Sequence, residues 1–358
     1  MNVQHFPKTA IGGGLTIANG VAYFAGLSAP GAGSVADQTR AILRQYDELF
    51  EQHGLLRKNM LYLSAFMRDP DLDHEMLDVY LQWMEADNST GGYTVMGLPV
   101  QPEEGNVDVV LSLMVATDPN AEIQRIDGSP TGCRAVICNG VAYFTGHIWA
   151  NGGDMRDQVA GVLGRYQEQF DRLGMKKENV LFANAFVDNK DQIEDFLGVW
   201  HDFFGDEGPA AMFVQARPSH SGKFGDSLKI ELAMFVAVGD DAQVERFEPE
   251  EGVGNNRVVI HQGLAYFTGH RARPGNPTLK DQTRALLDRY NELFQNYNLK
   301  KENIVAMFSY FNDISKYEDF ATQYQAWLPE GKAPADISVQ APSMGVNELE
   351  LQFIVAVD

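Results

Sequence analysis

The sequence contains one short segment three times, and this repetition constrains the fold more than any other feature. Gly20–Gly26, Gly140–Gly146 and Gly263–Gly269 share the pattern Gly-(Val/Leu)-Ala-Tyr-Phe-(Ala/Thr)-Gly. Successive copies lie about 120 residues apart, which is the size of a domain and too long for a solenoid repeat. The 358 residues are therefore predicted to hold three similar units, with function in the clefts between them.

The similarity extends beyond this segment and defines the units. Each copy continues with an Asp-Gln pair, an Arg-rich stretch containing a tyrosine, and a polar tripeptide that ends in asparagine. Each copy closes on an apolar strand that ends in Val-Ala. The units are predicted to span residues 8–118, 128–239 and 252–358, with acidic linkers at Pro119–Gln124 and Asp240–Gly254.

Composition limits the classes of function. The formal net charge of −21 repels phosphate backbones, so nucleic acid is not expected as a partner. No apolar run approaches 18 residues and the first residues do not resemble a signal peptide, so neither a membrane span nor secretion is expected. Cys133 and Cys138 are predicted on opposite faces of one strand, which favours reduced thiols and a cytoplasmic location.

The third unit illustrates the predicted secondary structure. Alternating residues on both sides of His261-Gln262-Gly263 indicate a hairpin, and helical spacing covers Leu279–Tyr297 and Ile314–Trp327. Strands are predicted at Ile304–Phe311, Ile337–Ala341 and Leu349–Val357. The order is ββαβαββ in each unit, an α+β class with both helices on one face of a mixed sheet.

The other face of each sheet must be buried against another part of the protein. Three units can cover one another and form a pseudo-threefold central barrel with the helices outside. The alternative is three units that fold separately, like beads on a string. Short linkers, and final strands that are apolar on both faces, favour the barrel.

These motifs, in this order and three times over, resemble the RidA/YjgF family. The resemblance rests on the hairpin that ends in Tyr-Phe-Thr-Gly, the Asp-Gln-Thr-Arg helix start, and the strand Pro-Ala-x-x-x-Val-Gln-Ala. It implies chorismate-mutase-like units and a RidA trimer fused into one chain, a pseudotrimer. It also implies clefts between units and deamination of imines or enamines such as 2-aminoacrylate. The older endoribonuclease (L-PSP) label of the family fits poorly with the acidic charge.

Two residues that the resemblance implies are missing. Family deaminases grip the substrate carboxylate with an arginine at the start of the fourth strand, where a guanidinium gives two parallel bonds. That position is occupied here by Gly92, Ala211 and Asp336. A glutamate is expected four residues later, and Met96, Gln215 and Gln340 occupy its place. Either the chemistry is rebuilt for another substrate or the sites are inactive.

Units two and three share replacements that unit one lacks. Thr145-Gly146-His147 and Thr268-Gly269-His270 stand where unit one has Ala25-Gly26-Leu27. A histidine can transfer protons near neutral pH, and the glycine N–H can hold a substrate oxygen. We therefore expect catalytic roles for His147, His270, Thr145 and Thr268, and substrate contacts for Gly146 and Gly269. A histidine without a role on an edge strand is the alternative.

Several further residues are candidates for substrate binding. Arg134 and Arg257 lie thirteen residues before each histidine, and Arg271 follows the second histidine directly. Arg217 lies on the strand of Gln215, two residues later. Any of these arginines can bind an anion or remain solvated at a strand edge. Gln215 and Gln340 can hydrogen-bond an amide-like substrate or only pack in their strands.

Unit one lacks the candidate residues, so the functional clefts are expected to involve units two and three. No phosphate-binding loop, nucleophile elbow or metal-ligand pair is found, so neither a cofactor nor a metal is expected. The favoured function is a Rid-family hydrolase or deaminase acting on a small imine, enamine or amide-like metabolite. A ligand-binding or regulatory protein using the same clefts without catalysis is the alternative, followed by a structural role. The expected particle is a monomeric pseudotrimer, and the sequence leaves further pairing of such particles open.

Overall fold

A computed structural model describes residues 2–9, 13–85, 92–97, 106–128, 133–218, 228–239, 241–272, 275–342 and 347–358. For Glu85 and for residues 92–97 it describes the backbone alone. Helices and strands alternate in three successive groups, which we call units 1, 2 and 3. Within the described residues, no helix is both long enough and apolar enough to cross a membrane.

The units share one order of elements. Unit 1 comprises β1 (Gln4–Pro7), β2 (Gly14–Ala18), β3 (Val21–Phe24), α1 (Val35–His53), β4 (Met60–Met67), α2 (Asp73–Glu85), β5 (Gly92–Gly97) and β6 (Val109–Ala116). Unit 2 comprises β7 (Gln124–Ile126), β8 (Ala135–Cys138), β9 (Val141–Phe144), β10 (His147–Ile148), α3 (Met155–Leu173), β11 (Val180–Val187), α4 (Ile193–Phe204), β12 (Ala210–Gln215), β13 (Arg217–Pro218) and β14 (Ile230–Ala237). Unit 3 comprises β15 (Glu245–Glu250), β16 (Asn255–His261), β17 (Leu264–Phe267), β18 (His270–Arg271), α6 (Leu279–Asn296), β19 (Ile304–Phe311), α7 (Tyr317–Trp327), β20 (Ala335–Gln340) and β21 (Leu349–Ala356).

Each unit forms a mixed sheet, as the sequence predicts. In unit 3 the strand order is β15-β16-β17-β21-β19-β20, with β19 and β20 parallel and the other pairs antiparallel. An extra strand precedes the predicted hairpin in every unit: β1, β7 and β15 pair with β2, β8 and β16. The interpretation of residues 240–254 as a linker was therefore wrong for Glu245–Glu250. Phe247 there is partly buried and packs against Tyr297, with ring centroids 5.1 Å apart, which helps to hold β15 on the sheet.

The repeated Asp-Gln pair has a structural role. The carboxylate of Asp37 closes a capping box with Ser34 at the start of α1, and Asp157 does the same with Asp154 at α3. The next residue, a buried glutamine, accepts a backbone N–H from the loop before the last strand. The three pairs are Gln38 with Asp108 at 2.9 Å, Gln158 with Lys229 at 2.9 Å, and Gln282 with Glu348 at 2.8 Å. The motif thus fixes each first helix to its sheet.

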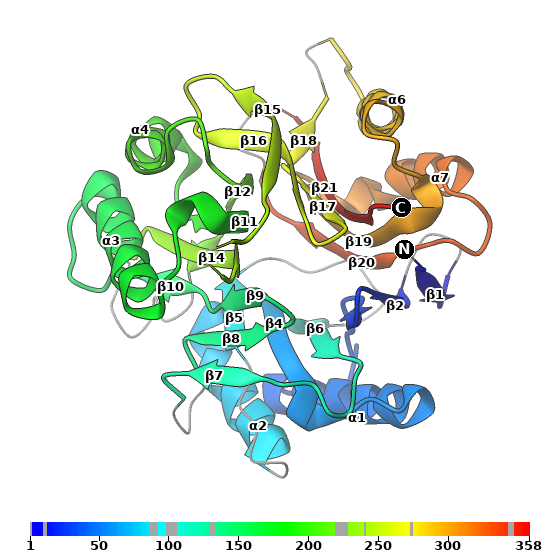
Figure 1. Cartoon of the computed structure of the whole chain (residues 1–358). Helices are drawn as coiled ribbons and strands as arrows, with labels where there is room; N and C mark the ends of the chain where they lie inside the picture. Colours follow the sequence, from blue (N-terminus) through cyan, green and yellow to red (C-terminus); the bar gives the residue numbers. More distant parts are fainter. Residues whose placement is uncertain are drawn as a thin grey trace.

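The three units meet through the sheet faces that their own helices leave uncovered. Figure 1 shows α1 and α2, α3 and α4, and α6 and α7 on the outside, with the strands between them. One core cluster contains Tyr23 of unit 1, Tyr143 of unit 2 and Tyr266 of unit 3. In addition, β13 of unit 2 pairs with β5 of unit 1 and so extends the neighbouring sheet. The described strands form three separate hydrogen-bonded sheets, and no closed barrel is seen among them.

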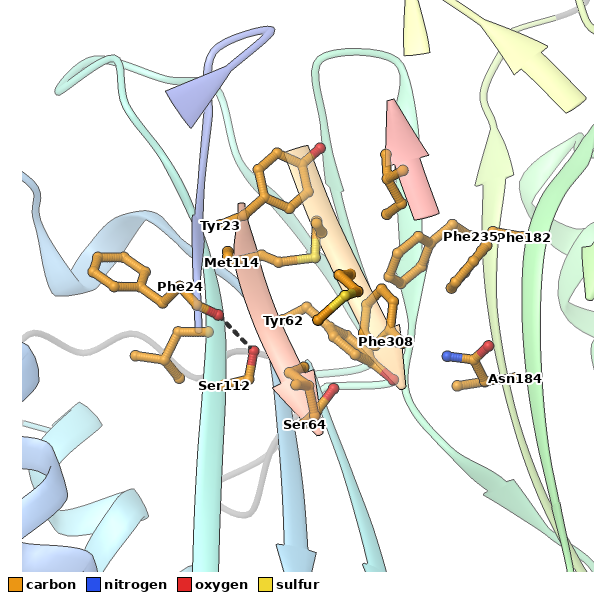
Figure 2. A pocket seen from close by; sticks show the side chains of 17 residues that line it. Tyr23, Phe24, Tyr62, Ser64, Ser112, Met114, Phe182, Asn184, Phe235 and Phe308 are labelled. Carbon is orange, nitrogen blue, oxygen red and sulfur yellow. Dashed lines mark hydrogen bonds between the residues drawn. The ribbon is translucent and has the colours of Figure 1, made fainter. Parts of the chain in front are cut away.

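A small cavity lies where the three units meet. Side chains from all units border it, including Tyr62 and Ser112 of unit 1, Asn184 and Phe235 of unit 2, and Phe308 of unit 3 (Figure 2). Its volume is about 30 Å³, which suits one or two water molecules and not a metabolite. The centre is thus packed, and larger openings lie nearer the surface.

Candidate functional site

The candidate site is a cleft of about 560 Å³ between units 2 and 3. Unit 2 supplies its apolar wall from α4 and β12, with Ile193, Leu197 and Phe213. Unit 3 supplies the polar wall from β15, β16, the end of the hairpin and β21. Four of the predicted site residues line this cleft: Arg257, Thr268, Gly269 and Arg271. We call the interface between two neighbouring units a seam. The seam between units 2 and 3 is therefore open to a small molecule.

Backbone bonds across the seam fix the position of the hairpin. The hydroxyl of Thr268 accepts the N–H of Ala211 in unit 2 and donates to the carbonyl of Asn256, both at 2.9 Å. The N–H of Gly269 donates to the carbonyl of Ala211 at 3.1 Å. The expectation that Gly269 holds a substrate oxygen is therefore wrong, because its only backbone donor already has a partner. Thr268 likewise joins the units, which leaves it no evident part in proton transfer.

A buried carboxylate that the sequence analysis overlooked lies in this cleft. Glu350 of β21 lines it with a side chain only 4% exposed. A Cβ atom placed on Gly269 would come within 2.2 Å of its Oε1, so Gly269 leaves the space that the carboxylate fills. The sequence analysis had sought the glutamate on the strand of Gln340. A signal was present on the last strand, where charged Glu231 and Glu350 interrupt apolar runs at equivalent positions.

Two arginines line the same cleft, and both are matched by acids. The Nε of Arg271 is 3.8 Å from Oε2 of Glu350. Arg257 lies 3.4 Å from Glu248 and 3.5 Å from Glu250. Both guanidinium groups are about two-fifths exposed, at 37% for Arg257 and 42% for Arg271, so they face the solvent side of the cleft.

The two histidines do not reach the cleft, which corrects the expectation that they carry protons. Successive residues of a strand face opposite sides, so Gly269 faces the seam while His270 packs on Tyr290, with ring centroids 5.2 Å apart. His147 stacks on Tyr166 at 4.4 Å, and one ring nitrogen (Nδ1) lies 2.9 Å from the carbonyl of Thr145. Burial lowers the pKa of His147 to about 4 and that of His270 well below its usual range. Both rings are therefore neutral near pH 7.

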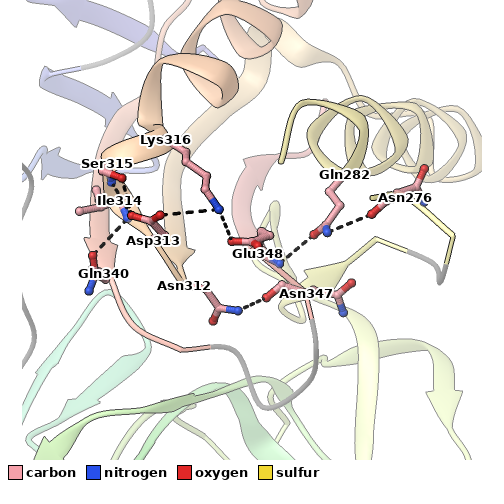
Figure 3. Close-up of polar contacts among 10 residues, drawn as sticks. All are labelled: Asn276, Gln282, Asn312, Asp313, Ile314, Ser315, Lys316, Gln340, Asn347 and Glu348. Atoms are coloured by element: carbon pink, nitrogen blue, oxygen red, sulfur yellow. Dashed lines mark hydrogen bonds and ion pairs between the residues drawn. The ribbon is translucent and has the colours of Figure 1, made fainter. Parts of the chain in front are cut away.

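The two glutamines and Arg217 serve local contacts instead of a common site. Gln340 accepts the backbone N–H of Ile314 at 3.2 Å at the start of a short helical turn (Figure 3). Gln215 donates to the carbonyl of Asp188 at 3.1 Å. Arg217 forms a bidentate contact with Asp71 of unit 1, at 2.9 and 3.0 Å. None of the three lines the cleft between units 2 and 3.

The seam between units 3 and 1 lacks the carboxylate found in the open cleft. The N–H of Gly26 donates to the carbonyl of Asp336 at 2.9 Å. In unit 1, Val110 occupies the position equivalent to Glu350. A Cβ atom on Gly26 would lie 2.8 Å from Cγ1 of Val110. The carboxylate of Asp336 accepts the N–H of Gly13, and burial raises the pKa of Asp336 to about 6.

The seam between units 2 and 1 repeats the carboxylate of the open cleft. A Cβ on Gly146 would come within 2.0 Å of Oε1 of Glu231, which is 2% exposed. Thr145 donates to the carbonyl of Arg134 at 3.2 Å, and Arg134 lies 3.6 Å from Asp127. The opposite wall comes from unit 1, where the side chains of Gly92 and Met96 lie outside the described part of the structure.

The described residues include no group of three or more His, Cys, Asp or Glu that could hold a metal ion. The arrangement is that of a three-unit α+β protein with a ligand-sized cleft at a seam between units. The sequence model of the Endoribonuclease L-PSP family matches residues 130–237 and again 248–357. The chain therefore belongs to this family, which is the RidA/YjgF family, and it carries the family domain in tandem.

Several solved structures are similar to parts of this chain. A YjgF-family protein from Neisseria meningitidis is 19% identical, and the match covers 33% of this chain and 97% of that one at a TM-score of 0.31. A YjgF/YER057c/UK114 family member from Mycobacterium tuberculosis is 17% identical, covering 32% and 100% at 0.27. A chorismatase is 11% identical, covering 84% and 93% at 0.54, which shows a shared fold over most of the chain. Among curated proteins no relative is found.

Proposed function

We propose that the protein is a hydrolase acting on the C–N bond of a small imine or enamine in the cleft between units 2 and 3. The observation that carries this proposal is the carboxylate of Glu350, which is buried yet lines a cleft of about 560 Å³. A carboxylate in such surroundings suits acid–base chemistry. Family membership supports the same general class of function.

The chemistry needs one water molecule and one group that moves protons. Glu350 accepts a proton from water as the water oxygen attacks the imine carbon. The same carboxyl then protonates the nitrogen of the tetrahedral adduct, which becomes a neutral carbinolamine. The hydroxyl proton of this adduct next passes through the carboxylate to the nitrogen, the C–N bond breaks with its electrons on nitrogen, and a carbonyl compound and ammonia leave. An enamine enters the same sequence after protonation at carbon. Arg271, whose Nε is 3.8 Å from Glu350, favours the ionised carboxylate that begins the cycle.

The neutral, buried histidines have no part in this proposal. Arg257 and Arg271 border the cleft and remain candidates for contacts with the substrate, while Ala211 stands where the resemblance implies a carboxylate-binding arginine. The seam between units 2 and 1, with Glu231, is proposed as a second site of the same kind. The seam between units 3 and 1, where Val110 replaces the carboxylate, is proposed to be inactive.

We further propose that the three units form a single closed pseudo-threefold particle, in place of a trimer of separate chains. The shared core cluster and the pairing of β13 with β5 support this arrangement. Light scattering should give the mass of one chain or a small multiple of it, and small-angle scattering a compact particle. An elongated, articulated particle would contradict this part of the proposal.

The function is tested by ammonia release from a panel of imines and enamines generated in solution, with and without a carboxylate. Glu350→Gln should abolish the release above background, since it removes the proton-transferring group while keeping its shape. Glu348→Gln is the matched control, because Glu348 lies two residues earlier and pairs with Lys316 outside the cleft. If no substrate turns over although small molecules stabilise the protein, a ligand-binding protein without catalysis is the better description.

A further inference from the structure

The cleft between units 2 and 3 is more acidic than a carboxylate-binding site should be. Among the described residues, its lining includes four glutamates, Glu194, Glu250, Glu251 and Glu350, and two arginines. A site that binds an anion normally carries an excess of cations or free N–H donors. Here the balance is reversed, in a chain whose overall charge is also strongly negative.

The two cations are already matched by acids of their own unit. Arg271 faces Glu350, and Arg257 lies between Glu248 and Glu250. The backbone N–H of Gly269, the other donor at this point, is bonded to Ala211. A carboxylate ligand would have to displace one of these partners, which lowers its affinity.

The remaining acids lack such partners. Glu194 at the start of α4 and Glu251 after β15 are exposed, line the cleft from opposite units, and form no ion pair with any described residue. The same cleft also has the apolar wall of Ile193, Leu197 and Phe213. A positively charged ligand group would gain contacts with the carboxylates, and an aromatic ring such as that of Phe213 also favours a cation.

We propose that this cleft takes small organic cations, in which a protonated amine, amidine or imine nitrogen is attached to an apolar body, in preference to carboxylic acids. This inference rests on the proposed function insofar as it concerns the same cleft, and it adds the class of substrate. The nitrogen faces the carboxylates of unit 3, and the apolar body lies on α4 and β12 of unit 2.

The preference agrees with the chemistry of imine hydrolysis. A protonated imine is the more reactive electrophile, and carboxylates nearby favour the protonated form. Water adds to the C=N bond of the cation, one proton moves from the added water to nitrogen, and ammonia leaves with the C–N bond electrons. The second proton of the water, left on the carbonyl oxygen, then passes to the ammonia. The products are a carbonyl compound and an ammonium ion, so charge and atoms balance without a co-reactant.

The test measures binding with three probes that share a benzyl body: benzylamine, benzyl alcohol and phenylacetate, at pH 7. Calorimetry and thermal stabilisation should rank benzylamine first and phenylacetate last. Benzylamine binding should weaken as NaCl is raised, because salt screens the exposed carboxylates. Each of Glu194→Gln and Glu251→Gln should weaken benzylamine binding by about two- to fivefold, the range for an exposed charge pair.

Glu318→Gln is the matched control, since it removes the same charge from exposed α7 away from the cleft. It should leave the affinity for benzylamine unchanged, which separates the local effect from that of the net charge. Phenylacetate binding as tightly as benzylamine, an equal effect of the control variant, or no binding of benzylamine at millimolar concentration would each overturn the inference. Binding is measured without turnover, so a protein that binds benzylamine but releases no ammonia would refute the proposed hydrolase alone.

Discussion

Glu350 lies directly against Gly269, so closely that a Cβ on the glycine would be 2.2 Å from the carboxylate oxygen Oε1. The same relation holds in unit 2, where a Cβ on Gly146 would be 2.0 Å from Glu231. The glycines of the repeated Thr-Gly-His segment are thus explained by close approach to a carboxylate. In unit 1 the carboxylate is replaced by Val110, whose Cγ1 would lie 2.8 Å from a Cβ on Gly26.

The first prediction concerns this contact. Gly269→Ala should destabilise the protein by about 1–3 kcal/mol, because the added methyl group meets Glu350 and also Met212 at 3.0 Å. It should also reduce ammonia release by moving the carboxylate. Chemical denaturation and the activity assay check both effects. Gly164→Ala is the control: it sits within α3 in open space, so it should stabilise the helix by up to about 1 kcal/mol.

The second prediction follows from the lowered pKa of His147, which is about 4 in the folded protein against 6.5 for the free side chain. Between these values the unfolded chain binds a proton and the folded protein does not, so stability falls as pH drops from 6.5 towards 4. The loss amounts to roughly 3 kcal/mol at most. Urea unfolding across this range should show it, and His147→Phe should remove this part of the dependence, leaving the part due to buried His270, while keeping the activity at pH 7. Activity that requires His147 at neutral pH would contradict our assignment.

The third prediction addresses Arg271. Arg271→Met removes the positive charge beside buried Glu350, and a carboxylate that loses such a neighbour binds its proton more tightly. The acid limb of the kcat/KM profile should therefore move to higher pH. Arg271→Lys should give a smaller shift. An unchanged profile in Arg271→Met, with activity retained, would show that Glu350 is not the titrating base.

The fourth prediction separates Arg217 from ligand binding. Arg217→Ala breaks the bidentate contact with Asp71 between units 2 and 1, but the guanidinium is 40% exposed, so solvent screening keeps the cost below about 1 kcal/mol. Affinity for benzylamine should not change. A large loss of affinity would place Arg217 in the binding site, as the sequence analysis considered.

Much of the fold was predictable because hydrophobic periodicity reports burial. The strand Ile304–Phe311 is correct at both ends, and the helix predicted over Leu279–Tyr297 differs by one residue from α6. The acidic residues of Glu245–Glu250 indicate a linker, because they give the segment a polar composition. The strand is held instead by partly buried Phe247, which packs on Tyr297. A separate edge strand has one exposed side, so its sequence need not look apolar.

The site was harder to predict, for reasons of orientation. The argument for His147 and His270 used their position beside a glycine, but neighbours in a strand point to opposite faces, and these rings face the helices of their own units. Arg257, Arg271, Thr268 and Gly269 were placed in the cleft correctly, although the hydrogen bonds of Thr268 and Gly269 across the seam depend on a partner far away in the sequence. Glu350 was not predicted because the family resemblance implies a glutamate on the strand of Gln340, β20, whereas Glu350 lies on the following strand, β21.

The three seams are encoded by separate stretches of one gene, and this frees them from one another. In an assembly of identical chains, any substitution appears at every interface at once. Here position 110 at one interface is a valine, while the equivalent positions 231 and 350 at the other two interfaces are glutamates. One interface can thus serve only to hold the three units together. The other two can acquire different ligand preferences, because each changes through its own mutations.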